Sequence, residues 1–79
     1  MVKIEHFGHL SSELKKIGCK LHHYRKNVNL YNFERGYELE IDREHFPKEA
    51  TVEQMQWLYE LAVQMNEEHP VVNKRFKWH

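Results

Sequence analysis

The first apolar residues of the chain recur at the spacing of a helix. Five of them are separated by three or four positions and would share one helical face: Ile4, Phe7, Leu10, Leu14 and Ile17. This pattern predicts a helix over residues 10–17. Two alternatives remain for its start: the helix begins near residue 4, or Ser11 caps a shorter helix. Lys15 and Lys16 suit the end of such a helix, and Gly18 suits the left-handed position that follows it.

From residue 19 onward, apolar and polar residues alternate, which is typical of strands with one buried face. Residues 19–24, 28–33 and 37–42 show this alternation, with short turns at 25–27 and 34–36, so an antiparallel meander is expected. The positions expected to face the core are Cys19, Leu21, His23, Val28, Leu30, Tyr37, Leu39 and Ile41. The positions expected on the opposite face are Lys20, His22, Tyr24, Asn29, Tyr31, Phe33, Glu38, Glu40 and Asp42.

The last predicted element is a second helix over residues 51–68, reached through a polar connection over 43–50. Thr51 is followed three positions later by Gln54, the signature of a capping box, and Pro70 lies beyond the helix end. The order α-β-β-β-α predicts a small α+β domain over residues 1–70, with a three-stranded antiparallel meander packed on two helices. Residues 71–79 are expected to be a basic aromatic tail or a short extra strand.

Composition supports one small globular domain. The chain has 79 residues, 41% apolar and 30% charged. No apolar run approaches the roughly 20 residues that span a bilayer, and the start lacks the apolar region of a signal peptide. With Cys19 as the single cysteine no intrachain disulfide can form, so a cytoplasmic protein without membrane contacts is expected.

The net charge is zero but unevenly distributed along the chain. Residues 1–33 carry a balance of +4, residues 34–69 a balance of −7 and the last ten residues a balance of +3. A bulk-charge attraction to nucleic acid is therefore excluded, while a local basic patch stays open.

Two clusters of potentially reactive side chains have simpler explanations. Cys19, His22 and His23 superficially match zinc spacing, but successive strand residues point to opposite faces and cannot converge on one ion. Glu38 and Glu40 share one strand face, where a solvated acidic row is simpler than an acid–base pair. Neither a metal nor a cofactor is expected.

The element order resembles the double-stranded-RNA-binding fold and the HicA-type toxin ribonucleases built on it. The likeness covers about residues 10–65, including the segment LKKIGCKL between helix and strand and a proline-containing connection before the last helix. These toxins carry a Gly-Ser-His signature at the start of the second strand, where the histidine is catalytic. Here the stretch is RKNVNLY, with Val28 or Asn29 in the histidine's place, so the likeness is one of topology and implies no activity.

Aromatic and basic residues gather on the outward positions of the first two strands. Tyr24, Tyr31 and Phe33 lie near Arg25 and Lys26, and together they are expected to bind a partner. Three explanations remain open for this surface: a protein interface, which includes self-association as a homodimer, a cover formed by the chain's own tail, and a nucleic-acid platform. Nucleic-acid contacts would add Lys20, Lys74, Arg75, Lys77 and Trp78.

The sequence therefore predicts a non-enzymatic binding protein with a protein partner, such as an adaptor, an inhibitor or an antitoxin-like regulator of the kind found on phages and mobile elements. The first alternative is an RNA- or DNA-binding domain. The second is a small histidine-dependent ribonuclease that uses His22 or His23.

Overall fold

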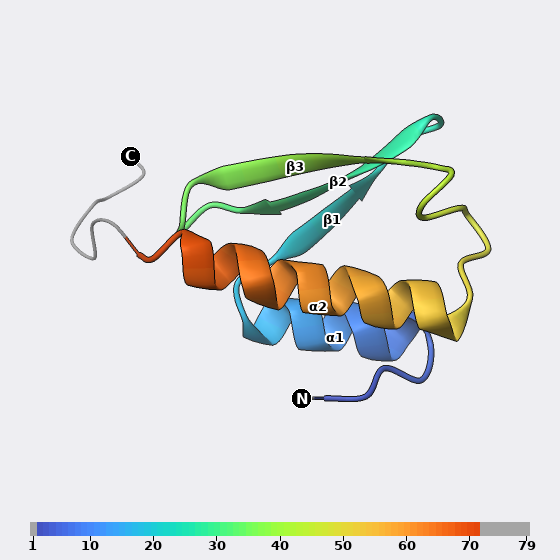
Figure 1. Ribbon diagram of the computed structural model, residues 1–79, viewed down its shortest axis with the longest axis horizontal. Helices are drawn as coiled ribbons and strands as arrows, with labels where there is room; N and C mark the ends of the chain where they lie inside the picture. The colour runs from blue at the N-terminus through green and yellow to red at the C-terminus, as the bar shows by residue number, and fades with distance from the viewer. Residues whose placement is uncertain (1, 72–79) are drawn as a thin grey trace.

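The computed structural model describes residues 2–71, and it confirms the predicted α+β fold and element order. The elements are α1 (Phe7–Lys16), β1 (Lys20–His23), β2 (Asn27–Asn32), β3 (Tyr37–Asp42) and α2 (Val52–Glu68). The two helices lie side by side against one face of the sheet, which we call the inner face (Figure 1). Neither α1 nor α2 lies over the opposite, outer face (Figure 1). Apart from Val71, the predicted tail lies outside the described residues.

The sheet is the expected antiparallel meander with the order β1-β2-β3. Leu21, Leu30 and Leu39 are aligned across the three strands, so these inward positions form one continuous apolar row. The backbone N–H of Tyr24 donates to the carbonyl of Asn27 at 2.8 Å and closes the first turn. Gly36 in the second turn has a φ of +73°, which glycine adopts without strain because it has no side chain.

The core lies between the inner face and the helices. Its fully buried apolar side chains include Leu10, Leu14, Val28, Leu30 and Leu58. The prediction of burial was wrong in degree for three inward positions. Leu21 and Leu39 are only partly buried and His23 is exposed. All three lie on the edge strands β1 and β3, where fewer neighbours cover a side chain than on the central strand.

The start of α1 differs from both alternatives given by the sequence. The helix begins at Phe7 and is capped by His6, whose Nδ1 accepts a hydrogen bond from the backbone N–H of His9 at 3.1 Å. Ser11 is an exposed residue within the helix. Histidine is an unusual cap, so the sequence did not indicate it. The helical spacing of apolar residues extended back to Ile4 because Ile4 is buried in the core, although it lies before the helix.

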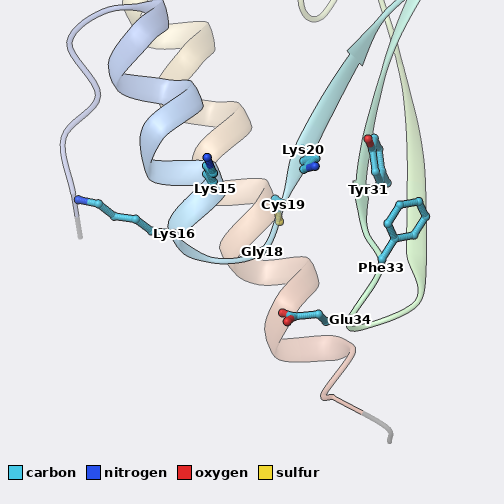
Figure 2. Close-up of a pocket in the computed structure, with 8 residues that line it drawn as sticks. All are labelled: Lys15, Lys16, Gly18, Cys19, Lys20, Tyr31, Phe33 and Glu34. Carbon is cyan, nitrogen blue, oxygen red and sulfur yellow. The ribbon is translucent and has the colours of Figure 1, made fainter. Parts of the chain in front are cut away.

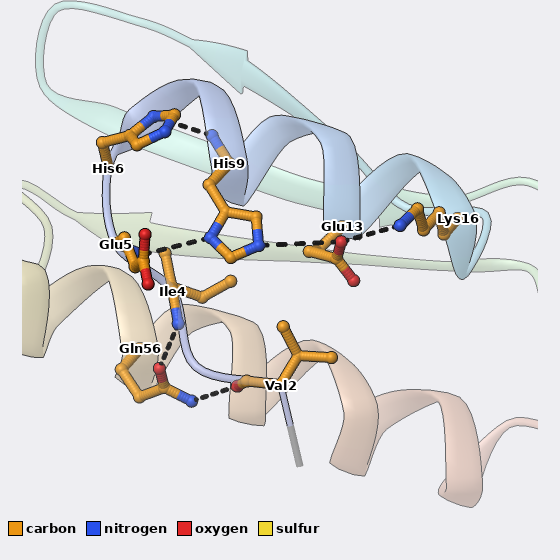
Figure 3. Close-up of polar contacts among 8 residues, drawn as sticks. All are labelled: Val2, Ile4, Glu5, His6, His9, Glu13, Lys16 and Gln56. Atoms are coloured by element: carbon orange, nitrogen blue, oxygen red, sulfur yellow. Dashed lines mark hydrogen bonds and ion pairs between the residues drawn. The ribbon is translucent and has the colours of Figure 1, made fainter.

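Ile4 is held by α2 (Figure 3). Its backbone N–H donates to Gln56 Oε1 at 2.7 Å, and Gln56 Nε2 donates to the carbonyl of Val2 at 2.9 Å. A single glutamine side chain thus pairs with one backbone N–H and one backbone carbonyl of the segment before α1. This pairing explains how residues that precede α1 reach the core without forming a helix.

The connection between β3 and α2 is not purely polar, which corrects the prediction for residues 43–50. Phe46 is 0% exposed and packs edge-on against Phe7 at a ring distance of 6.0 Å. Arg43 holds the connection through hydrogen bonds to the carbonyls of Tyr24 and Phe46. One large apolar residue in a polar run gives no periodic signal, so alternation could not reveal it.

The predicted start of α2 is confirmed. Thr51 Oγ1 accepts from the N–H of Gln54 at 3.1 Å, and Gln54 Oε1 accepts from the N–H of Thr51 at 2.8 Å. These reciprocal bonds form the capping box. Neither helix of the described part of the chain is long and apolar enough to cross a membrane.

Candidate interaction surface on the outer sheet face

Four rings lie next to one another on the outer face, and we call them the aromatic row: Tyr24, His22, Tyr31 and Phe33. The ring centroids of His22 and Tyr24 are 5.0 Å apart, those of His22 and Tyr31 are 6.4 Å apart, and those of Tyr31 and Phe33 are 5.0 Å apart. Tyr24 is 45% exposed and Phe33 is 68% exposed, while Tyr31 between its neighbours is partly buried. The row is thus a band of aromatic rings on the face opposite the helices.

Strand geometry produces the row. His22 and Tyr24 are two positions apart on one chain, as are Tyr31 and Phe33, so each pair shares a face. The register places Lys20 opposite Tyr31, which makes His22 the diagonal neighbour of Tyr31 and joins the two pairs. The outward orientation predicted for His22, Tyr24, Tyr31 and Phe33 is therefore present, and His22 is the member that was not predicted to bind a partner.

Basic residues flank both ends of the row. Arg25 and Lys26 are exposed in the β1–β2 turn beside Tyr24. At the other end, Lys20 shares a surface hollow of about 400 Å³ with Tyr31 (Figure 2). The hollow is lined by Lys15, Lys16, Gly18, Cys19, Lys20, Tyr31, Phe33 and Glu34. The contribution of Lys15 and Lys16 from the end of α1 follows from tertiary structure alone.

Acidic residues occupy the β3 side of the same face. Glu38, Glu40 and Asp42 are exposed, and Glu38 accepts a hydrogen bond from Asn29 Nδ2 at 2.6 Å. His45 contacts Asp42 at 2.8 Å, and its side-chain hydrogen bond is the main reason that the pKa of Asp42 lies below its usual value. The outer face therefore carries aromatic and basic groups over β1 and β2 and acidic groups over β3.

Cys19, His22 and His23 do not converge on one point. Cys19 is buried on the inner side, His22 belongs to the aromatic row, and His23 points to the inner side against Phe7 at 5.5 Å. Partial burial of the imidazole is the main cause that lowers the pKa of His23, with the charge of Arg43 next. Among residues 2–71, no group of three or more His, Cys, Asp and Glu side chains could hold a metal ion.

A buried polar cluster at one end of the sheet was not predicted. Asn32 is 0% exposed and donates from Nδ2 to Asn66 Oδ1 at 3.2 Å, and Tyr37 donates to the same oxygen at 2.5 Å. Cys19 Sγ lies 3.1 Å from the Tyr37 hydroxyl. Burial, more than this cysteine contact, raises the pKa of Tyr37.

The cluster ties the α1–β1 connection and the β2–β3 turn to the end of α2. Asn32 and Asn66 both donate to the carbonyl of Ile17 at the end of α1, at 3.2 Å and 3.0 Å. Arg35 donates to the carbonyls of Asn66 and His69 at the end of α2. In the described part of the chain no buried side-chain N or O atom lacks a partner, so the cluster is a satisfied structural network. Alternation after Val28 and Leu30 was the signal that Asn32 points inward.

Comparison with known proteins adds no relative to this description. No protein-family model, no curated protein and no solved structure matches the chain. The structure itself places the candidate partner-binding residues on one surface: Tyr24, Arg25, Lys26, Tyr31 and Phe33. Lys74, Arg75, Lys77 and Trp78, which were expected to contact nucleic acid with Lys20, lie outside the described residues.

Proposed function

We propose that this protein is a non-enzymatic binding module, of the adaptor or inhibitor kind, which recognises a protein partner through the outer sheet face. The aromatic row carries this proposal, because contiguous rings on the face that α1 and α2 leave uncovered are the kind of group that anchors protein interfaces. A cytoplasmic location is part of the proposal, since the buried free thiol of Cys19 suits a reducing compartment.

The charges around the row favour a protein over a nucleic acid. Glu38 is the register partner of Tyr31, so a phosphate backbone stacked along the row would meet the acidic side chains of β3. A protein surface can place basic groups over β3 and acidic groups near Lys20 or Arg25. Mixed charge around an apolar centre therefore supports a protein partner.

Substitution of Tyr31 tests the proposal. The full-length protein is used to capture partners from nuclease-treated lysate of the source cells, and the captured protein is purified for affinity measurements. Loss of a central aromatic anchor typically costs at least about 2 kcal/mol of binding free energy, so Tyr31→Ala should weaken binding about 30-fold or more. Trp57→Ala is the control, because Trp57 is 40% exposed on α2 and its ring stacks on His45, not on a member of the aromatic row.

Two outcomes would contradict the proposal. If nuclease abolishes capture, and Lys26→Ala or added salt weakens binding as much as Tyr31→Ala, the ligand is a nucleic acid. If instead Tyr31→Ala and deletion of residues 72–79 both lower the thermal unfolding midpoint without affecting capture, the row is an internal packing surface. A protein interface predicts a nearly unchanged midpoint together with the loss of binding.

A further inference from the structure

The outer edge of β1 is a second surface with its own recognition chemistry. β1 is an edge strand: it pairs with β2 on one side, and within residues 2–71 no strand pairs with its other side. Backbone groups of an antiparallel pair point alternately toward and away from the partner strand. Counted from the Tyr24–Asn27 hydrogen bond, the N–H and C=O groups of Lys20 and His22 point toward β2, and those of Leu21 and His23 point to the free edge.

A groove follows this edge. It has a volume of about 360 Å³, and its walls include Ser11, Leu14 and Lys15 from α1 and Lys20, Leu21 and His23 from β1. The N–H of Cys19 is already used, since it donates to the carbonyl of Leu14 at 2.9 Å and ties the start of the strand to the helix. The groove therefore offers two rungs of backbone hydrogen-bonding groups beside the apolar side chains of Leu14 and Leu21.

The charge of the groove selects the occupant. Lys15 and Lys20 are exposed on opposite walls, and within the described residues neither forms an ion pair. Lys16 extends the basic strip but is paired with Glu13 at 2.9 Å. Glu34 lies at the far end, in the adjoining hollow that shares Lys15, Cys19 and Lys20 with the groove. An acidic side chain of a bound peptide would therefore lie near Lys15 and Lys20, neither of which is already ion-paired within the described residues.

We propose that the edge of β1 accepts an extended acidic peptide segment as a fourth strand of the sheet. The segment would exchange backbone hydrogen bonds with Leu21 and His23 and place carboxylates near Lys15 and Lys20. This surface adjoins the aromatic row at Lys20, but its backbone hydrogen-bonding groups belong to Leu21 and His23, which are not members of the row. A test that follows the amides of Leu21 and His23 can therefore succeed or fail independently of the function proposed above.

Two other occupants fit the groove less well. A nucleic acid supplies phosphates for the lysines but no regular row of backbone donors and acceptors to match Leu21 and His23. A second copy of β1 would bring another Lys20 against the same basic strip, and like charges across a strand pair are destabilising. An acidic peptide satisfies both the hydrogen-bonding and the charge requirement.

The probe for the experiment is a capped heptapeptide of alternating glutamate and valine, titrated into the full-length protein. Amide hydrogen exchange is followed by NMR for Leu21 and His23, with His22 as the internal control because its N–H points toward β2. In the free protein the first two amides should exchange faster than that of His22. Addition of the peptide should slow them at least about tenfold, since exchange then requires the peptide to dissociate.

Charge and backbone are then varied separately. The double variant Lys15→Glu with Lys20→Glu should weaken the glutamate peptide about tenfold or more and should gain affinity for a heptapeptide of alternating lysine and valine. Peptides with every second amide N-methylated, made in both phases, keep their charge but lose one row of donors. One of the two phases should fail to bind.

Four results would overturn the proposal. The peptide does not bind at millimolar concentration, which would mean that the lysines only discourage strand pairing. Both methylated peptides bind as the parent does, or a single-stranded oligonucleotide binds more tightly, which would reduce the site to a basic patch. Finally, Leu21 and His23 are already protected in the free protein, so that the chain itself or a second copy covers the edge.

Discussion

Replacement of Asn66 by alanine tests whether the buried polar cluster stabilises the fold. The side chain of Asn66 makes three hydrogen bonds with nitrogen and oxygen groups, from the Tyr37 hydroxyl and Asn32 Nδ2 and to the carbonyl of Ile17. Cys19 Sγ adds a longer and weaker one, at 3.6 Å from Asn66 Oδ1. At about 1 kcal/mol of net stabilisation for each bond, Asn66→Ala should lower the free energy of unfolding by about 3 kcal/mol. The vacated volume adds to this cost, since the site is 8% exposed.

This loss is large for so small a domain. At roughly 0.05–0.15 kcal/mol per residue, a chain of 79 residues has a stability of about 4–12 kcal/mol. A domain of this size loses about 4–8 °C of thermal midpoint per kcal/mol, so Asn66→Ala should lower the midpoint by about 12 °C or more. Gln64→Ala is the matched control on the same helix, because Gln64 is exposed and should change stability by less than about 0.5 kcal/mol.

Urea unfolding followed by circular dichroism measures both variants. Combination of Asn66→Ala with Tyr37→Phe in a double-mutant cycle should give a coupling free energy above about 0.5 kcal/mol, because the two side chains are hydrogen-bonded. The reasoning would be refuted if Asn66→Ala cost less than about 1 kcal/mol. It would also be refuted if Asn66→Leu, which fills the volume without hydrogen bonds, were as stable as the original protein.

Three further predictions concern other parts of the fold. Phe46→Ala should cost about 3–5 kcal/mol in urea unfolding, since the ring is fully buried, and a loss below 1 kcal/mol would show that the connection packs loosely. Gly18→Ala should cost about 1–2 kcal/mol, because φ is +81° and alanine is strained in this left-handed conformation; an unchanged midpoint would contradict this. The pKa of His23 is lowered from 6.5, so the folded state binds fewer protons than the unfolded state; stability should be highest above pH 6.5 and fall as the pH drops through the folded pKa. Urea midpoints at pH 7.5 and 5.5 should therefore differ more for the original protein than for His23→Gln, and equal differences would exclude this role.

The periodicity of the sequence determined the element order and the two faces of the sheet. A strand has a side-chain period of two, so alternation assigns each position from 37 to 42 to one face of the sheet without knowledge of the elements that pack beside it. For the same reason the outward orientation of Tyr31 and Phe33 was predictable. The capping box of Thr51 and Gln54 is equally local, because both residues lie within one helical turn.

Only the tertiary structure decided which side chains meet across the chain. The burial of Ile4 and Phe46 depends on packing against distant elements, and the Asn32–Asn66 contact joins residues 34 positions apart. Likewise, Lys15 on α1 and Lys20 on β1 flank one groove because the chain reverses direction between them. Periodicity reports the direction of a side chain relative to its own element, whereas contacts between elements depend on how the elements pack. The sequence pattern therefore determined the two faces of the sheet. The buried polar cluster and the groove beside β1 depend on packing, so only the tertiary structure showed them.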